Sequence, residues 1–325
     1  MRYFITGATG FVGGALAGKL RKQGHEVRAS VRDPEKAGAL KAIGVQLFKG
    51  DVTDKGSMRE AMSGADGVFH VAGWYKVGAH DKSGGEKVNI QGTRNVLELM
   101  QELKIPRGVY TSTLAVNSDT HGKLVDETYR FQGRHLSEYD RTKAAAHEIA
   151  QGFIANGLPL VIVMPGAIYG PSDTSTLRVN LISLLKGQLP MLPAQTQLCW
   201  AHVDDVVQGH ILAMEKGKSG GSYIIAGEPY KVSEAFKLAS QIAGKRAPMV
   251  VPHQLVKVMS VLAGPFDALL PESYTSEGLR IVAGVTYLGD NGRAKKELGY
   301  TVRPFHEGWR ATVQHEMSLL GMKKS

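Results

Sequence analysis

The chain has 325 residues, of which 43% are hydrophobic and 21% are charged. This composition excludes an intrinsically disordered chain and allows a large buried core. The single cysteine, Cys199, excludes an intrachain disulfide and a cysteine-rich zinc site. The net charge is +9, but the basic residues are scattered rather than gathered in a tail or stripe, so we expect no nucleic-acid partner.

No segment predicts a membrane span. The apolar run at 160–170 is too short, and the run at 249–264 is interrupted by His253 and Lys257. The first residues, MRYFITGATGFVG, lack the basic region and unbroken apolar stretch of a secretory leader. We therefore expect a cytoplasmic protein with no integral membrane segment.

Apolar segments typical of buried strands alternate with segments of helical periodicity. Strands are expected at 2–5, within HEVRASVRDP after Gly24, and at 45–48, 67–73, 107–116 and 158–166. Helices are expected from Val12 to Gly24 and at 55–62, 88–103 and 137–156. This alternation predicts an α/β fold with a doubly wound parallel sheet, in the manner of a Rossmann domain.

Beyond residue 170 the alternation loosens, and prolines separate shorter elements such as the strand-like 222–227. We expect residues 1–170 to form a dinucleotide-binding Rossmann domain. Residues 171–325 are expected to form mainly a smaller substrate-binding lobe, with some segments returning to the sheet. Such a lobe covers the carboxyl ends of the strands, where open α/β sheets bind their ligands.

The first strand runs into TGATGFVG, which places Gly7, Gly10 and Gly13 at a strand–helix turn. In a dinucleotide-binding turn these glycines permit a tight bend, close approach to a pyrophosphate, and close packing of helix on sheet. Glycine-rich turns also arise for packing reasons, but the surrounding strand–turn–helix pattern favours dinucleotide binding.

The end of the second expected strand bears on cofactor choice. An acidic residue usually stands there in NAD-binding proteins, whereas this chain has Val31 followed by Arg32, with Lys36 nearby. A guanidinium complements the 2′-phosphate of NADP, although it is also an ordinary solvated side chain. We expect NADP(H) to be favoured over NAD(H).

Two further patterns carry acid–base chemistry. Tyr139 and Lys143 are four residues apart on an expected helix and therefore share one face. An ammonium close to a phenol lowers the phenol pKa, which we expect for Tyr139. The hydroxyl-bearing strand end Tyr110-Thr111-Ser112-Thr113 lies between this pair and the glycine turn. Tyr-x-x-x-Lys also arises by chance, so its weight comes from this context.

Together with GDVTD, HVAG, MPGAIYGP and HVDDV, these motifs resemble the extended short-chain dehydrogenase/reductases over essentially the whole chain. The similarity is greatest to the dihydroflavonol-4-reductase-like branch of this epimerase/dehydratase superfamily. The resemblance implies that Tyr139 is the general acid–base and that Lys143 orients the nicotinamide ribose. It also implies that Thr113 is the catalytic hydroxyl, with Ser112 as the alternative. Asn89 is expected either to position the proton relay or to cap a helix.

The resemblance also implies a set of cofactor-binding residues. It consists of Gly7, Thr9, Gly10, Phe11, Val12, Gly13, Arg32, Lys36, Asp51, Val52, Ala72, Gly73, Tyr139, Lys143, Pro165, Gly166 and Ile168. His202 and Asp204 are expected to fasten the lobe to the sheet. A homodimer through helices 88–103 and 137–156 is what the superfamily usually forms.

Two departures from the nucleotide-sugar enzymes bear on the substrate. Met164 stands where those enzymes usually have Asn, and Leu198 stands where they have an arginine for the sugar diphosphate. Apolar side chains cannot hold a diphosphate. Candidate residues for an apolar pocket, each equally explicable as packing, are Trp74, Tyr75, Met164, Tyr169 and Trp200. The polar, glycine-rich loop 74–87 is expected to act as a lid.

We therefore expect an NADPH-dependent oxidoreductase that reduces a ketone or aldehyde of a small, fairly apolar molecule. An NAD(P)-dependent nucleotide-sugar epimerase or dehydratase is the first alternative. A non-catalytic dinucleotide-sensing regulator is the second, although such proteins commonly lack the Tyr-x-x-x-Lys pair. No metal site is expected.

Overall fold

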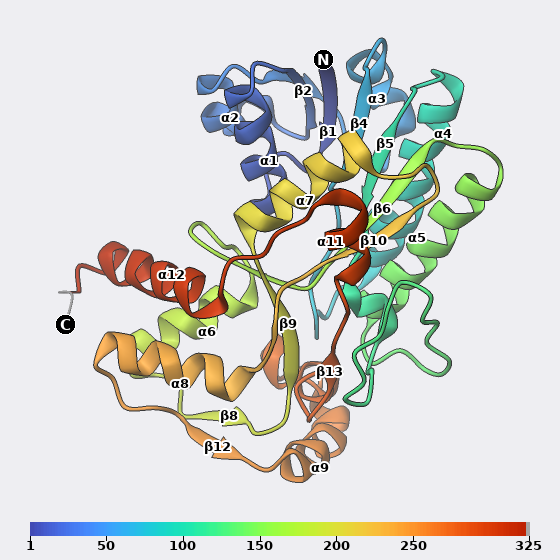
Figure 1. Ribbon diagram of the computed structural model, residues 1–325. Coiled ribbons are helices and arrows are strands. Elements are labelled where there is room, and N and C mark those ends of the chain that lie inside the picture. The colour runs from blue at the N-terminus through green and yellow to red at the C-terminus, as the bar shows by residue number, and fades with distance from the viewer. Residues whose placement is uncertain (323–325) are drawn as a thin grey trace.

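The computed structural model describes residues 1–322 and has a seven-stranded parallel sheet at its centre (Figure 1). Its order is β10-β6-β5-β4-β1-β2-β3. The strands are β1 (Arg2–Thr6), β2 (Glu26–Val31), β3 (Gln46–Lys49), β4 (Gly67–His70), β5 (Gly108–Thr111), β6 (Leu160–Pro165) and β10 (Ser222–Ile225). The predicted doubly wound α/β fold is confirmed.

Helices cover both faces of this sheet. On one face lie α1 (Phe11–Lys22), α7 (Val203–Lys216) and α11 (Gly292–Leu298), and on the other α3 (Lys55–Met62), α4 (Thr93–Glu102) and α5 (Glu138–Ala155). The short helices η1 (Pro34–Ala37) and α2 (Gly38–Ala42) connect β2 to β3. Each face has its own apolar core, which explains why the strands are apolar throughout rather than alternating.

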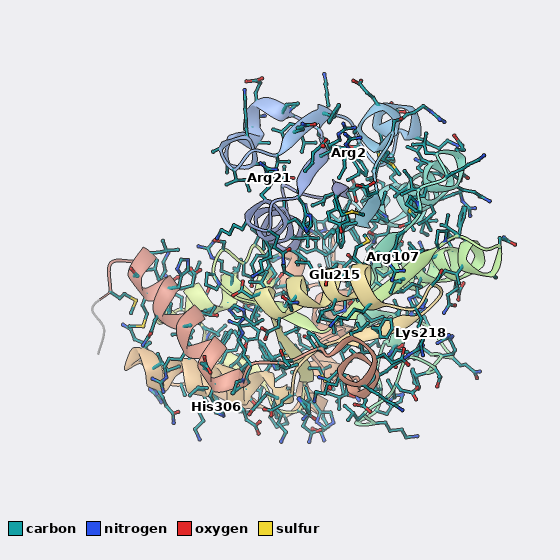
Figure 2. The ribbon with its side chains drawn as sticks, turned by 45° about the horizontal axis from the view of Figure 1, so that its top comes forward. Arg2, Arg21, Arg107, Glu215, Lys218 and His306 are labelled. Carbon is teal, nitrogen blue, oxygen red and sulfur yellow. The ribbon has the colours of Figure 1, made fainter. Side chains whose placement is uncertain are left out.

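Side chains at the sheet margins fasten helices to strands. Asp54 caps α3 by accepting hydrogen bonds from the amides of Gly56 and Ser57, so this helix begins where the sequence predicts. Arg107 donates to the carbonyl oxygens of Ala213 and Gly217, which ties the start of β5 to the end of α7 (Figure 2).

The remaining residues form a smaller lobe. Its strands are β7 (Ala167–Tyr169), β9 (Gln197–His202), β11 (Pro229–Lys231) and β13 (Thr286–Tyr287), with β8 (Met191–Pro193) paired to β12 (Met249–Val251). Its helices are α6 (Thr176–Leu185), α8 (Val232–Ala243), α9 (His253–Ala263), α10 (Ser276–Arg280) and α12 (Phe305–Leu319), with short turns η4 (Gly264–Phe266) and η5 (Glu272–Tyr274). An aromatic core centred on Trp200 and Trp309 holds it together.

Three predicted elements differ from the observed ones. Strand 67–73 ends at His70 because the amides of Val71 and Ala72 turn to donate to Thr6 Oγ1, each at 3.2 Å. Strand 107–116 ends at Thr111, since Thr113 caps the short helix η3 (Leu114–Asn117). Helix 88–103 starts earlier, as a π-helical segment, η2 (Gly85–Gly92), that continues into α4.

Among the described residues, no helix is both long enough and apolar enough to cross a membrane.

Candidate active site

The turn between β1 and α1 is tight and leaves the start of α1 uncapped. Gly7 has a φ of +73°, and a Cβ there would lie 2.7 Å from the Ala72 nitrogen. A Cβ on Gly13 would lie 2.2 Å from the Gly7 carbonyl oxygen. Gly10 precedes α1 without a capping side chain, and the first turn of α1 has no acidic residue. The backbone N–H groups at this helix start are therefore left for a ligand, as pyrophosphate binding requires.

The end of β2 carries the two bases predicted to select NADP. Arg32 follows β2 directly and is exposed, and its guanidinium forms no ion pair with any residue in 1–322. Lys36 is also exposed, but its ammonium lies 3.2 Å from the Asp33 carboxylate. Val31 is buried in the core. Arg32 is thus the base that is free to meet a phosphate.

The other predicted cofactor residues lie along the same carboxyl edge of the sheet. Asp51 and Val52 follow β3, Ala72 and Gly73 follow β4, and Pro165 ends β6. The Val52 carbonyl accepts from Asn95 Nδ2 at 2.8 Å, which fixes the backbone at that point. Parallel strands present their ligand crevice at this edge. Thr9 and Phe11–Val12 lie at the α1 turn, Gly166 follows β6, and Ile168 lies on β7.

Tyr139 lies in the first turn of α5, which Ser137 caps by accepting from the Asp140 amide. Burial raises the pKa of Tyr139 to about 12, a hydrogen bond from the Thr113 side chain lowers it, and the charge of Asp140 raises it. The expectation of a lowered Tyr139 pKa is therefore wrong, because burial of the phenol dominates. At neutral pH Tyr139 is accordingly protonated and can act as an acid.

Lys143 lies one turn further along α5 and is buried. Its ammonium donates to the Thr111 carbonyl oxygen at 2.8 Å and to Tyr110 Oη at 3.2 Å. Burial lowers the pKa of Lys143 to about 7. The ammonium is directed toward β5, so β5 and α5 are joined at the point where both carry predicted catalytic groups.

The two candidate hydroxyls lie in different surroundings. Ser112 is 3% exposed, and its Oγ is 2.8 Å from His147 Nδ1. Thr113 is half-buried and is the hydroxyl residue that hydrogen-bonds Tyr139. The structure brings Thr113, rather than Ser112, to the tyrosine.

Asn89 connects the loop after β4 to α5. Its carboxamide accepts from the Trp74 amide at 2.7 Å and donates to the Trp74 carbonyl and to Thr142 Oγ1, each at 2.9 Å. It lies inside η2, so it caps no helix. Asn89 holds the cofactor-side loop against the helix that carries Tyr139 and Lys143.

Asp140 was not singled out from the sequence, because its helical pattern gives no sign that the side chain is buried. Its carboxyl group is hydrogen-bonded by Ser137 at 2.8 Å, Ser118 at 3.2 Å and Tyr287 at 3.1 Å. Burial raises the pKa of Asp140 to about 7. Because Tyr287 belongs to β13, this carboxyl group joins the start of α5 to the smaller lobe.

Most of the residues predicted to line an apolar pocket are buried inside the protein. Met164, Tyr169 and Trp200 are each 2% exposed. Met164 packs in the sheet core, and Tyr169 lies edge-on to Trp200 within the aromatic core of the lobe. The prediction that these three residues line a substrate pocket is wrong. They pack in the apolar cores, because neighbouring side chains enclose them. Trp74 is half-buried and Tyr75 is 56% exposed, so both keep accessible surface.

The loop 74–87 is fastened to the smaller lobe by one buried carboxylate. Glu277 on α10 accepts from the Gly78 amide at 3.1 Å and from the Lys82 ammonium at 2.5 Å. Gly78 has a φ of +70°, and a Cβ there would lie 2.1 Å from the Glu272 carbonyl oxygen. The loop therefore spans from the end of β4 to α10.

Comparison with known proteins identifies the family of this chain. The family model described as "NAD dependent epimerase/dehydratase family" matches residues 3–226. The chain belongs to that family. The resemblance to the extended short-chain dehydrogenase/reductases is thereby confirmed, and with it membership of a superfamily of oxidoreductases and epimerases. Within residues 1–322, no cluster of His, Cys, Asp and Glu is arranged to hold a metal ion.

Several relatives are similar over nearly their whole length. A Synechocystis protein provisionally named as a dihydroflavonol 4-reductase is 32% identical, over 91% of this chain and 89% of its own. The Stigmatella aurantiaca 4-hydroxy-2-methyl-3-oxo-4-farnesyl-3,4-dihydroquinoline-1-oxide ketoreductase is 30% identical, over 94% of each chain. The gox2253 crystal structure superposes with a TM-score of 0.85 at 29% identity, covering 99% of both chains. A Thermotoga maritima UDP-glucose 4-epimerase shares the fold, with a TM-score of 0.80 at 20% identity and coverage of 98% and 100%.

Proposed function

We propose that this protein is an NADPH-dependent reductase acting on the ketone or aldehyde carbonyl of a small, largely apolar molecule. The observation that carries the proposal is that Tyr139 and Lys143 share one face of α5, where Lys143 bonds to the end of β5 and the Thr113 side chain is close enough to Tyr139 to lower its pKa. A bound nicotinamide would supply the hydride. The glycine turn fits its pyrophosphate, since Gly7 and Gly13 let α1 pack close to the sheet and the start of α1 has neither a capping side chain nor an acidic residue.

The chain's own residues supply the proton and the orientation. Tyr139 donates its hydroxyl proton to the carbonyl oxygen, and Thr113 donates a hydrogen bond that stabilises the negative charge developing there. Lys143, held by the Thr111 carbonyl, places a positive charge on the same helix face and favours the phenolate left behind. Arg32 is available for the 2′-phosphate that distinguishes NADPH.

The substrate class is supported by what replaces the polar groups of the nucleotide-sugar enzymes. Leu198 packs at the aromatic core of the lobe, and Met164 is buried. Neither side chain can bind a diphosphate. The relatives include a ketoreductase whose named substrate carries a farnesyl chain and a Methylococcus capsulatus sterol demethylase protein B that is 27% identical. Both names involve apolar molecules.

The test is a calorimetric titration of purified protein with NADPH and with NADH, after its absorbance has been checked for retained nucleotide. NADPH oxidation is then followed with apolar ketones. Conversion of UDP-sugars to their epimers is followed in parallel by chromatography, because an epimerase regenerates its cofactor and causes no net NADPH oxidation. Tighter NADPH binding and turnover of ketones support the proposal. Retained NAD with turnover of UDP-sugars would establish an epimerase. Binding of a nucleotide without turnover of either substrate class would favour the non-catalytic dinucleotide-sensing regulator, and binding of neither nucleotide would overturn the proposal.

A further inference from the structure

Helix α9 exposes an apolar face to solvent. Leu255, Val258, Val261 and Leu262 are between 50% and 76% exposed. Their spacing places them on one side of the helix. The opposite side is apolar too, and packs through Val256 and Ala263 into a small core with α10. An apolar helix face normally lies buried, yet this face of α9 is uncovered.

The apolar surface continues beyond α9. Phe266 is 58% exposed and Leu269 is 85% exposed. We call Leu255, Val258, Val261, Leu262, Phe266 and Leu269 the α9 patch. Figure 1 places α9 at the edge of the smaller lobe, away from the helices that flank the main sheet. Contiguous apolar surface of this kind marks an interaction site in a folded protein.

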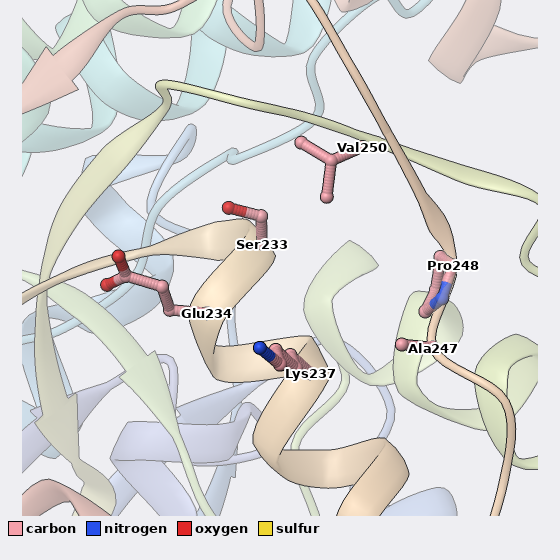
Figure 3. A pocket seen from close by; sticks show the side chains of 6 residues that line it. All are labelled: Ser233, Glu234, Lys237, Ala247, Pro248 and Val250. Atoms are coloured by element: carbon pink, nitrogen blue, oxygen red, sulfur yellow. The ribbon is translucent and has the colours of Figure 1, made fainter.

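Exposed basic side chains lie on α9 and before it in the chain. Lys257 is on α9, whereas Lys245 and Arg246 lie between α8 and β12, and in the described chain none of the three forms an ion pair with an acidic residue. The same stretch holds two acids, the exposed Glu272 and Asp267, whose pKa is lowered by hydrogen bonds from Ser276, so its bases exceed its acids by one. Figure 3 shows a further base, Lys237, in a pocket that Val250 and the acidic Glu234 also line. The local charge is therefore positive, as is the net charge of +9.

The combination of exposed apolar and basic side chains distinguishes two possible partners, a second copy of the chain and a lipid bilayer. A symmetric contact with a second copy of the chain would bring the same lysines and arginine face to face, and like charges oppose such a contact. An anionic phospholipid surface complements both features, because acyl chains accept the apolar side chains and headgroups attract the bases.

We propose that the α9 patch docks this protein on the surface of an anionic phospholipid bilayer. The six apolar side chains enter the boundary between headgroups and acyl chains. Lys245, Arg246 and Lys257 lie at the level of the headgroups. The docking is peripheral and goes beyond the proposed reductase function, on which it does not depend.

The fold connects the α9 patch to the proposed active site. Helix α9 packs on α10, and Glu277 of α10 holds the loop 74–87 through Gly78 and Lys82. Docking therefore brings the bilayer next to the loop beside the proposed active site. If the proposed function holds, an apolar substrate has a short path from the bilayer to that site.

The experiment measures co-sedimentation of the full chain with vesicles, without cofactor or substrate. One set is phosphatidylcholine alone, and the other also contains phosphatidylglycerol at about one lipid in four. The patch variant is Val261→Glu with Leu262→Glu, and the charge variant is Lys245→Glu with Arg246→Glu. Val179→Glu on α6, where Val179 is 58% exposed, is the matched control.

The wild-type chain and the control are expected to bind the phosphatidylglycerol vesicles, with weaker binding at higher salt. Each double variant should bind them at least about tenfold more weakly. Because all the substituted side chains are exposed, thermal unfolding should confirm that every variant folds. Absence of wild-type binding, or equal loss in the control, would overturn the proposal. The proposal would also be overturned if light scattering shows the wild-type chain as a dimer and the patch variant as a monomer, while neither protein binds vesicles.

Discussion

The ammonium of Lys143 donates a hydrogen bond to the carbonyl oxygen of Thr111 at 2.8 Å. Lys143 shares a helix face with Tyr139, and Thr111 ends the strand that leads to Thr113. The contact therefore sets the separation between the proposed acid and the proposed hydroxyl before any ligand binds. Preorganisation of this kind is where most of an enzyme's electrostatic advantage arises.

Removing the Tyr139 hydroxyl should stop the chemistry and spare the fold. Tyr139→Phe is expected to lower turnover by about 10²- to 10⁴-fold, the range typical of a lost general acid. NADPH affinity by calorimetry should stay close to that of the wild-type chain. Near-normal turnover in this variant would show that another group supplies the proton.

The two adjacent hydroxyls can be separated by mutation. Thr113→Ala should lower turnover by about a hundredfold because a hydrogen bond to the reacting oxygen is lost. Thr113→Ser should restore most of it. Ser112→Ala should keep turnover and instead lower stability, since His147 loses its partner. The reverse pattern in steady-state kinetics would transfer the catalytic role to Ser112.

Lys143 should give the wild-type protein a characteristic dependence of stability on pH. Its folded pKa of about 7 lies below its ordinary value of 10.5. The unfolded chain therefore binds more protons between these values, and the free energy of unfolding rises with pH across that window. Urea unfolding should show the wild-type chain losing stability relative to Lys143→Met as pH falls from about 10 to 7. Parallel curves for the two proteins would contradict the buried ammonium.

Asp140 should act in the opposite direction. Its folded pKa of about 7 lies above its ordinary value of 3.8, so its stabilising contribution is present at low pH and lost as pH rises through about 7. Asp140→Asn should lack this decline. Because ionised Asp140 raises the pKa of Tyr139, the variant should also lose reductase activity at a lower pH than the wild type does. An unchanged pH–rate profile would limit Asp140 to a structural role.

Arg32 and Lys36 provide a matched pair for cofactor choice. Arg32→Ala should weaken NADPH binding by at least about tenfold and leave NADH binding nearly unchanged, since a charge-assisted hydrogen bond to the 2′-phosphate is lost. Lys36→Ala should have a smaller effect because Lys36 already pairs with Asp33. Equal loss for both nucleotides in Arg32→Ala would remove the basis for NADP preference.

The sequence pattern predicts six sheet strands along the chain and four of the helices between them, because buried parallel strands and amphipathic helices leave clear periodicities. It predicts the glycine turn and the helical proximity of Tyr139 and Lys143 for the same local reasons. It does not show that β4 ends early at His70, because that depends on the hydrogen bonds from the amides of Val71 and Ala72 to Thr6, which is 65 and 66 residues away in the chain.

Burial determines which candidate pocket residues keep accessible surface and which do not. Trp74 follows β4 and Trp200 lies within β9, but Trp200 is enclosed by Phe305 and Trp309 from α12. No local pattern reports such an enclosure. The same applies to Asp140, whose partners Ser118 and Tyr287 are distant in sequence.

The carboxylate of Glu277 makes access to the proposed active site sensitive to ionic strength. Of its two contacts, the one to the Gly78 amide is buried, whereas the Lys82 side chain is 47% exposed. Dissolved ions compete with the exposed contact and leave the buried one largely unaffected. Moderate salt is therefore expected to loosen the loop at Lys82 while it stays hinged at Gly78. The rate of substrate entry should then rise with ionic strength even for an uncharged substrate.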